Sequence, residues 1–383
     1  MATNRLQVTD LDFDTIKNNL KTFLKSQSEF SDYDFEGAGL NVLLDILAYN
    51  THYNAYYVNM VANEAFLDTA ILRNSVVSHA KMLGYTSKST TSPRAVIDLT
   101  VPTNSNTVDS LTIPRGFSFK SEQIDNISYN FVVLEDVTVE KTGNNFVYLD
   151  LPIYEGQLVS YNYVYNQSSN PKAVFTLPDS NVDTTSLYVT VQTSTSNLTS
   201  AIYTKSTDIL DIDLNSEVYF LQEGLNNEYQ IYFGNGIIGK QIPDGAVVNI
   251  NYLVTSGADS NKANNFVVNS VVGAFSNYTV NPVSEASGGA TRETATSIKE
   301  NSILQYSTQD RLVTIKDYQS YIKKNYPAVQ SISVWGGEDE IPPVFGKVFI
   351  SIKPKDNYYI TGVEKQRIID EIIKPKSMIS VSS

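Results

Sequence analysis

The chain has 383 residues, of which 42% are hydrophobic and 18% charged, and its 28 basic and 41 acidic residues give a net charge of −13. This length exceeds what one hydrophobic core usually organises, so we expect two to four compact units. The negative charge disfavours nucleic-acid binding, the lack of an apolar run of about 18 residues argues against membrane insertion, and the absence of cysteine removes disulfides and sulfur-ligated zinc.

Residues 1–90 are predicted to form a helical N-terminal domain. Asp12 or Asp14 is positioned to cap the first helix. The apolar stripe of that helix comprises Ile16, Leu20, Phe23 and Leu24. A further helix is expected from about Asp68, and Gly84 is expected to end it in a left-handed conformation.

The helix predicted over residues 40–60 is apolar around most of its circumference, as expected of a helix that is buried on several sides. We therefore predict that this helix belongs to an interface. The candidate interface residues are Tyr49, Tyr53, Tyr56 and Tyr57. The alternative is that this face packs inside the N-terminal bundle, and that alternative applies more to Leu43 and Leu47 than to Tyr53 and Tyr57.

Residues 92–280 are predicted to be all-β, as one or two β domains. Hydrophobic residues begin to alternate after Ser92, and strand-like runs recur between turn signals such as Pro243-Asp244-Gly245. Residues 288–383 are predicted to form a small α+β domain. Within it, Thr314 and Asp317 form a capping box for a helix that buries Ile315, Tyr318 and Ile322.

A last strand is expected to begin at Met378 to Val381, so this C-terminal domain is expected to be incomplete. The predicted fold class is therefore α+β multidomain, with an N-terminal helical bundle, a large all-β middle region and a small C-terminal α+β domain. Two polar segments rich in small residues, Tyr85–Ser92 and Ser284–Gly289, are predicted to be hinges between these parts.

The glycines Gly234, Gly236 and Gly239 satisfy the GxGxxG pattern of dinucleotide-binding proteins. That site requires a helix directly after the motif, whose N-terminus binds the pyrophosphate. Here a turn and another strand are predicted instead, so we interpret the three glycines as a structural turn.

Other chemistry is not indicated. Histidine occurs only at His52 and His79, and neither belongs to a catalytic or metal-binding pattern. The acidic triplet Glu338-Asp339-Glu340 is interpreted as a solvated loop. We therefore predict no enzyme activity, no cofactor, no metal and no small-molecule substrate. A hydrolase that uses acidic residues is the alternative, and loss of activity on removing one carboxylate would identify it.

Eight short motifs, in this order, resemble the baseplate J-like family, and most closely the baseplate wedge proteins of T-even-type contractile-tailed phages. The motifs are GLNVLL at 39–44, NEAFLDTA at 63–70, LGY at 83–85, YFGNG at 232–236, PDG at 243–245, GGA at 288–290, RLVT at 311–314 and WGGE at 335–338. Together they span most of the chain.

This resemblance implies a structural virion protein of the tail baseplate, assembled in the bacterial host cytoplasm. Its partners would be copies of itself, as a dimer within a wedge, and other wedge proteins, and the assembly would rearrange when the tail sheath contracts. One alternative is a glycan- or receptor-binding tail module, since the middle of the chain is rich in Tyr and Asn. Another is the baseplate of a phage-derived contractile injection system.

Overall fold

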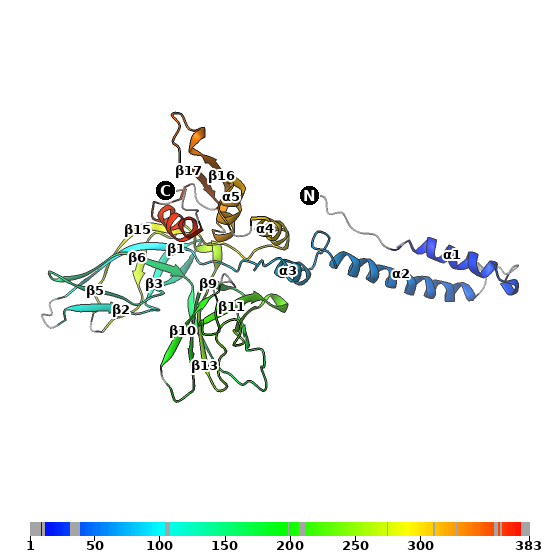
Figure 1. The fold of residues 1–383 in the computed structure, drawn as a ribbon, viewed down its shortest axis with the longest axis horizontal. Coiled ribbons are helices and arrows are strands. Elements are labelled where there is room, and N and C mark those ends of the chain that lie inside the picture. The colour runs from blue at the N-terminus through cyan, green and yellow to red at the C-terminus, as the bar shows by residue number, and fades with distance from the viewer. Residues whose placement is uncertain are drawn as a thin grey trace. The chain divides into compact units, whose positions relative to one another are not determined.

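The structure is a computed structural model that divides into two compact units, Met1–Leu83 and Gly84–Ser383 (Figure 1). The residues it describes are 9, 12–30, 39–103, 108–197, 199–206, 212–273, 275–308, 311–326, 328–355, 359–360 and 362–376. The strand predicted at Met378 to Val381 lies outside these residues. Among the described helices, none is both long and apolar enough to cross a membrane.

The first unit consists of helices. They are α1 (Phe13–Lys25), a short 3₁₀ turn (Ser28–Phe30), α2 (Leu40–Glu64) and α3 (Arg73–Met82). Asp12 caps α1 by accepting a hydrogen bond of 3.1 Å from the Thr15 amide, as predicted. Phe23 is 64% exposed, so its predicted place on the buried stripe is wrong. Gly84 follows α3 with φ of +75°, which confirms the predicted helix stop.

Glu64 organises the corner between α2 and α3. Its carboxylate accepts hydrogen bonds from the amides of Ile71 (2.9 Å) and Leu72 (3.2 Å), at the start of α3. Its carbonyl oxygen lies 2.9 Å from Nε2 of His79. The carboxylate thus satisfies amides that a helix N-terminus leaves unpaired. Glu64 of the NEAFLDTA motif therefore has a structural role.

The second unit contains two large sheets. The first has the strand order β14-β3-β4-β6-β1-β15, with β2 and β5 attached to it through β6. Its strands are β1 (Arg94–Pro102), β2 (Ser110–Ile113), β3 (Ser118–Ile124), β4 (Ile127–Val132), β5 (Val137–Thr142), β6 (Asn145–Glu155), β14 (Phe266–Val268) and β15 (Thr279–Ser287). Alternating residues of β1, including Ile97, Leu99 and Val101, are fully buried, as their period-two spacing predicts.

The second sheet is inserted between β6 and β14 of the first. Its order is β7-β13-β9-β10-β11-β12-β8, and only the β10–β11 pair is parallel. The strands are β7 (Gln157–Val164), β8 (Val174–Leu177), β9 (Val182–Gln192), β10 (Ser200–Lys205), β11 (Val218–Glu223), β12 (Tyr229–Phe233) and β13 (Val247–Val254). Its core contains the buried tyrosines Tyr165, Tyr203, Tyr219, Tyr229 and Tyr252.

The C-terminal part is helical with a two-stranded hairpin. Its elements are α4 (Ala295–Thr308), α5 (Ile315–Asn325), β16 (Val329–Gly336), β17 (Val348–Pro354) and α6 (Gly362–Arg367), which continues through Lys376. The predicted capping box of Thr314 and Asp317 is present at α5. Tyr318 and Ile322 are buried as predicted, whereas Ile315 is 49% exposed. The α+β multidomain fold class is confirmed.

Neither predicted hinge is a loose linker. Residues 85–92, here called the polar strap, bury Ser87, Ser89, Thr90 and Ser92, each at most 6% exposed. The Ser92 amide donates to Asp183 of β9 (2.8 Å), and Thr91 forms a β-bridge with Ala290. Residues 284–287 are the end of β15 and pair with β1. Small polar side chains therefore occur here because they fit a buried hydrogen-bonded junction.

Candidate assembly surface

Helix α2 exposes most of its apolar side chains. One row follows the helix in alternating steps of four and three residues, and every member is at least 39% exposed. The row consists of Val42, Ile46, Tyr49, Tyr53, Tyr56 and Met60. We call it the tyrosine seam. This spacing of about 3.5 residues is the one by which helices pack side by side in coiled coils and bundles.

A second row lies beside the first with the same spacing. It consists of Leu43, Leu47, Asn50, Asn54, Tyr57 and Val61, all exposed. We call it the asparagine seam, because the Asn54 amide donates to Asn50 Oδ1 at 2.9 Å in its centre. Leu43 and Leu47 are 55% and 54% exposed. The alternative that they pack inside the N-terminal bundle is therefore wrong.

The tyrosines are ordered against one another along the helix. The Tyr49 and Tyr53 hydroxyls are hydrogen-bonded at 3.0 Å, and their ring centroids are 4.6 Å apart. Tyr57 follows, with its ring centroid 6.4 Å from that of Tyr53. The hydrogen bond to Tyr53 raises the pKa of Tyr49. An ordered, uncharged aromatic surface loses little side-chain entropy when it is covered.

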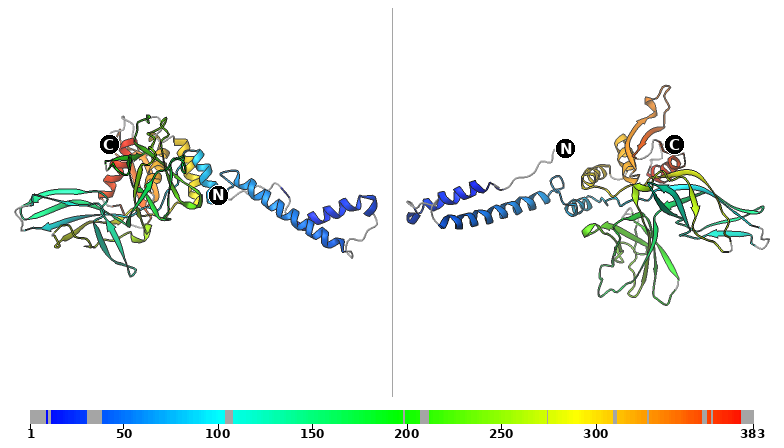
Figure 2. Two further views of the ribbon diagram at one scale, coloured as in Figure 1. Left: turned by 90° about the horizontal axis from the view of Figure 1, so that it is seen from below. Right: turned by 180° about the vertical axis from the view of Figure 1, so that it is seen from behind.

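The third side of α2 is covered within the helical unit. Leu44, Ala48 and Ala55 are buried, and α1 lies along the helix (Figure 2). The Asn59 side chain exchanges two hydrogen bonds of 3.1 Å with the Thr9 backbone. Helix α2 therefore has one covered side and two open seams.

The predicted glycine turn connects β12 to β13, and no helix follows it. The Gly236 amide donates to the Gly239 carbonyl (3.1 Å), and the Gly239 amide donates to the Asp213 carbonyl (3.0 Å). Gly236 and Gly239 have φ of +81° and +78°, and a Cβ on Gly234 would lie 2.2 Å from the Gly239 carbonyl carbon. These amides are used internally, and this geometry favours a structural turn over a phosphate site.

No metal site emerges from the described residues, which contain no group of three or more His, Asp or Glu side chains able to hold an ion. His52 lies against Tyr53 with ring centroids 6.0 Å apart, and His79 contacts the Glu64 carbonyl. Both histidines thus have packing or hydrogen-bonding surroundings in the helical unit.

The sequence interpretation missed Val42, Ile46 and Met60 as members of the surface. The signal was present, because the steps of four and three residues can be read from the sequence alone. What the sequence did not show was which of three apolar rows α1 would cover.

Three family models match the chain. They describe the helical domain of gp6-like baseplate wedge proteins (residues 12–85), domain II of baseplate wedge protein gp6 (residues 94–156) and C-terminal domain I of baseplate structural protein gp6 (residues 314–382). The matched segments together make up more than half of the chain. Three segments of the chain therefore resemble successive domains of gp6-like baseplate wedge proteins.

One relative is baseplate wedge protein gp6 of Enterobacteria phage T4, which is 32% identical over 389 residues. The match includes 93% of this chain and 56% of that protein, so the chain spans little more than half the length of this relative. Among solved structures, a chain of the anti-feeding prophage (AFP) baseplate, solved by cryo-EM, matches with 12% identity and a TM-score of 0.30. The match covers 98% of this chain and 79% of that one. Because the TM-score is so low, the match supports no statement about the fold.

Proposed function

We propose that this protein is a structural component of the baseplate wedge of a contractile phage tail. In this role it assembles with copies of itself and with other wedge proteins, and it rearranges when the sheath contracts. The matches to three gp6-like wedge domains and the 32% identity to a baseplate wedge protein support the role. In the same proposal, the protein belongs to the tail baseplate of the virion and is assembled in the host cytoplasm.

The observation that carries the proposal is the pair of open seams on α2. A 25-residue helix is about 37 Å long, and α2 presents apolar side chains along nearly all of this length in the tyrosine seam and at both ends of the asparagine seam. Exposed contiguous apolar surface of this kind marks a protein interaction site. Two seams with coiled-coil spacing accommodate two additional helices, and we propose that a second copy of this chain supplies at least one of them.

The test is sedimentation velocity of the full chain over a wide concentration range. Tyr53→Asp combined with Tyr57→Asp places one charge in each seam, and we expect it to abolish self-association without changing circular dichroism or melting temperature. A matched control, Val164→Asp with Ile202→Asp, adds two charges at exposed apolar positions of the second sheet. We expect that control to associate like the wild type. Loss of helical signal in the seam variant, or a wild type that stays monomeric with and without other wedge proteins, would overturn the proposal.

Three finer assignments are also proposals. The residues 232–245 support kinship with the baseplate J-like family. The domain boundaries 1–90, 92–280 and 288–383 are to be tested by limited proteolysis. The setting of a phage-derived injection system remains the alternative to a phage tail, and identifying the particles that contain the protein separates the two.

The glycan-binding alternative loses part of its motivation in the structure. It was based on the Tyr-rich middle region, but many of those tyrosines, including Tyr148, Tyr219, Tyr229 and Tyr252, are at most 3% exposed. Burial also raises the pKa of Tyr219 and Tyr252. These residues build the sheets, and a glycan array probed with the full chain is expected to be blank.

A further inference from the structure

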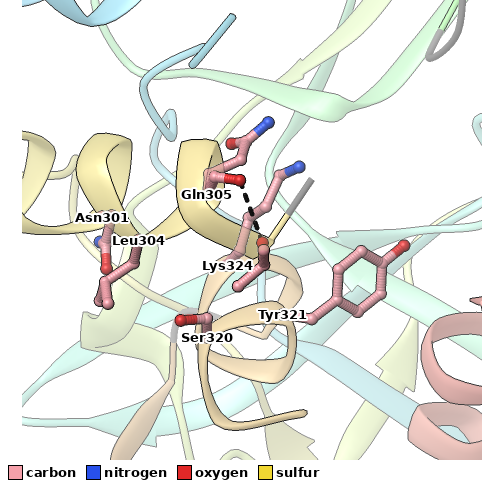
Figure 3. A pocket seen from close by; sticks show the side chains of 7 residues that line it. Asn301, Leu304, Gln305, Ser320, Tyr321 and Lys324 are labelled. Carbon is pink, nitrogen blue, oxygen red and sulfur yellow. Dashed lines mark hydrogen bonds between the residues drawn. The ribbon is translucent and has the colours of Figure 1, made fainter. Parts of the chain in front are cut away.

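The space between α4 and α5 is too small to bind a ligand. It is lined by Leu304, Tyr321 and Lys324, among others, and has room for about one water molecule (Figure 3). Hydrogen-bonding groups that another molecule could use occur instead along the outer edge of β7, at one end of the second sheet.

The outer edge of β7 consists of backbone groups that are not used in the sheet. Among the described strands, β7 pairs with β13 alone, and the hydrogen bonds of an antiparallel pair alternate along each strand. The Tyr165 amide continues this pairing by donating to the Ala246 carbonyl (2.7 Å), whereas the Gly156 amide donates to Asn130 on the opposite side (2.8 Å). The residues of β7 that direct their N–H and C=O groups away from β13 are therefore Leu158, Ser160, Asn162 and Val164.

This edge lacks the features that usually keep sheet edges from pairing, which are charged side chains, proline or short length. At the ends of the first sheet, β15 contains Pro282 and Glu285, and β14 has only three residues. At the other end of the second sheet, β8 has four residues. Strand β7 has eight residues with no proline and no charged side chain, and Ser160, Asn162 and Val164 are exposed. It is therefore open to pairing with another chain.

The two faces of β7 differ in polarity. Val159 and Tyr163 pack against the core of the second sheet. Tyr161 lies on the same face, with its ring centroid 4.6 Å from that of Tyr163, but it is 36% exposed. An apolar side chain on a strand beside β7 would cover this ring, and such cross-strand pairs stabilise sheets. The opposite face presents Ser160 and Asn162 to solvent. A matching strand therefore alternates apolar and polar residues.

We propose that β7 accepts an extended segment of a different protein as an additional strand of the second sheet. The segment has about five to seven residues and pairs with the free backbone groups of residues 160, 162 and 164. In strand addition of this kind, backbone hydrogen bonds supply affinity and alternate side chains supply specificity. The segment is uncharged, because a charged side chain beside β7 would lose hydration without finding a charged partner in the strand.

A second copy of the chain fits this edge less well than a separate segment. Antiparallel pairing of two β7 strands places the start of one beside the end of the other. The start is already occupied by β4, through the hydrogen bond between Gly156 and Asn130, so β4 of each copy would meet the chain that follows β7 in the other. The inference rests on the proposed function only in that the partner belongs to the same particle.

Photo-cross-linking identifies the partner of the edge. Val164, which is 65% exposed, is replaced by the photoreactive amino acid p-benzoylphenylalanine in cells that produce the complete particle. We expect an adduct with a different protein, joined through an uncharged stretch of about five to seven residues that mass spectrometry locates. Ile202 is exposed on β10, which is paired on both sides, and the same replacement there is the control. It should give at least about ten-fold less adduct. An adduct with a second copy, an adduct through a charged segment, or no adduct would overturn the proposal.

Proline in the edge separates pairing from folding. Asn162→Pro removes an amide that β13 does not use, which edge strands tolerate, so the melting temperature should stay within about 3 °C of the wild type. The adduct at residue 164 should fall about ten-fold or more, whereas Asn162→Thr, which keeps the amide, should leave it unchanged. Ser160→Pro repeats the measurement if the first variant melts early.

Equal adduct yields from the proline and threonine variants would contradict the proposal. In sedimentation velocity, Asn162→Pro should self-associate like the wild type. Failure of the edge contact is therefore distinguishable from failure of the α2 interface.

Discussion

Glu293 lies buried where the polar strap passes the start of α4, at 8% exposure. Its carboxylate accepts hydrogen bonds from the Tyr85 hydroxyl (2.8 and 2.9 Å), the Lys88 amide (3.0 Å), the Ser297 hydroxyl (2.8 Å) and the Asn301 amide (2.6 Å). Burial and this carboxylate raise the pKa of Tyr85, so the phenol remains a donor. One carboxylate thus joins the strap to the C-terminal helices, and full satisfaction of its oxygens makes its burial tolerable.

Replacing Glu293 by Gln should destabilise the second unit, because the new amide group would face several donors. We expect a loss of about 2–4 kcal/mol in the free energy of unfolding, measured by urea denaturation. Glu300→Gln, an exposed change in α4, is the control and should have little effect. Equal stability of the two variants would show that the Glu293 network contributes nothing.

Lys88 is expected to make the free energy of unfolding depend on pH in the alkaline range. Its pKa is lowered from its ordinary value to about 8 in the folded chain, mainly by burial. Between about pH 8 and 10 the unfolded chain binds this proton and the folded chain does not, so stability rises with pH. Lys88→Met should remove a rise on the order of 2–3 kcal/mol across this window, measured by urea unfolding at each pH. Lys172→Met, at an exposed position, should leave the slope unchanged.

At the scale of elements, the turn between β12 and β13 contains three glycines of one motif. They differ in how strongly an added side chain would disturb the turn. Gly236 requires only a positive φ, and a Cβ there would meet nothing closer than 3.6 Å. Gly239 combines a positive φ with a contact of 3.1 Å to Val218. At Gly234 a Cβ would overlap the backbone of residues 238 and 239, at 2.2 to 2.5 Å. Spacing in the sequence cannot reveal this difference.

We therefore expect Gly234→Ala to destabilise the second unit by about 3 kcal/mol or more, and Gly236→Ala by about 1 kcal/mol, with Gly239→Ala between them. Denaturant unfolding of the three variants measures the order. Equal effects would show that the turn adjusts its backbone freely. Binding of a nicotinamide or flavin cofactor to the wild type would contradict the structural interpretation altogether.

At the scale of the whole molecule, the two units differ in how many of their side chains are buried. Helix α1 has no buried residue, and α2 has five, two of them asparagines. The second unit contains large continuous cores in both sheets. Helical stability comes mostly from packing of an apolar face, so the helical unit is expected to gain much of its stability from partners.

Hydrogen exchange of the full chain at low concentration tests this expectation. The amides of α1 and α2 should exchange at least about 100-fold faster than those of β1, β9 and β13. Raising the chain concentration, or adding other wedge proteins, should slow exchange along α2 in the wild type and not in the Tyr53→Asp, Tyr57→Asp variant. Equal protection of both units in the dilute monomer would show that the helices are stable alone.

The sequence by itself determined the order of the parts, since hydrophobic period and capping residues act over a few neighbouring positions. Asp12, Gly84 and the Thr314–Asp317 box could be identified because their partners lie within a turn of helix. Only the tertiary structure decided which apolar row of α2 is covered and that Phe23 and Ile315 face solvent. It also decided that residues 85–92 are a buried strap, because Glu293 and Asp183 reach it from distant positions in the sequence. Burial depends on which surfaces meet, and contacts between distant residues leave no local pattern.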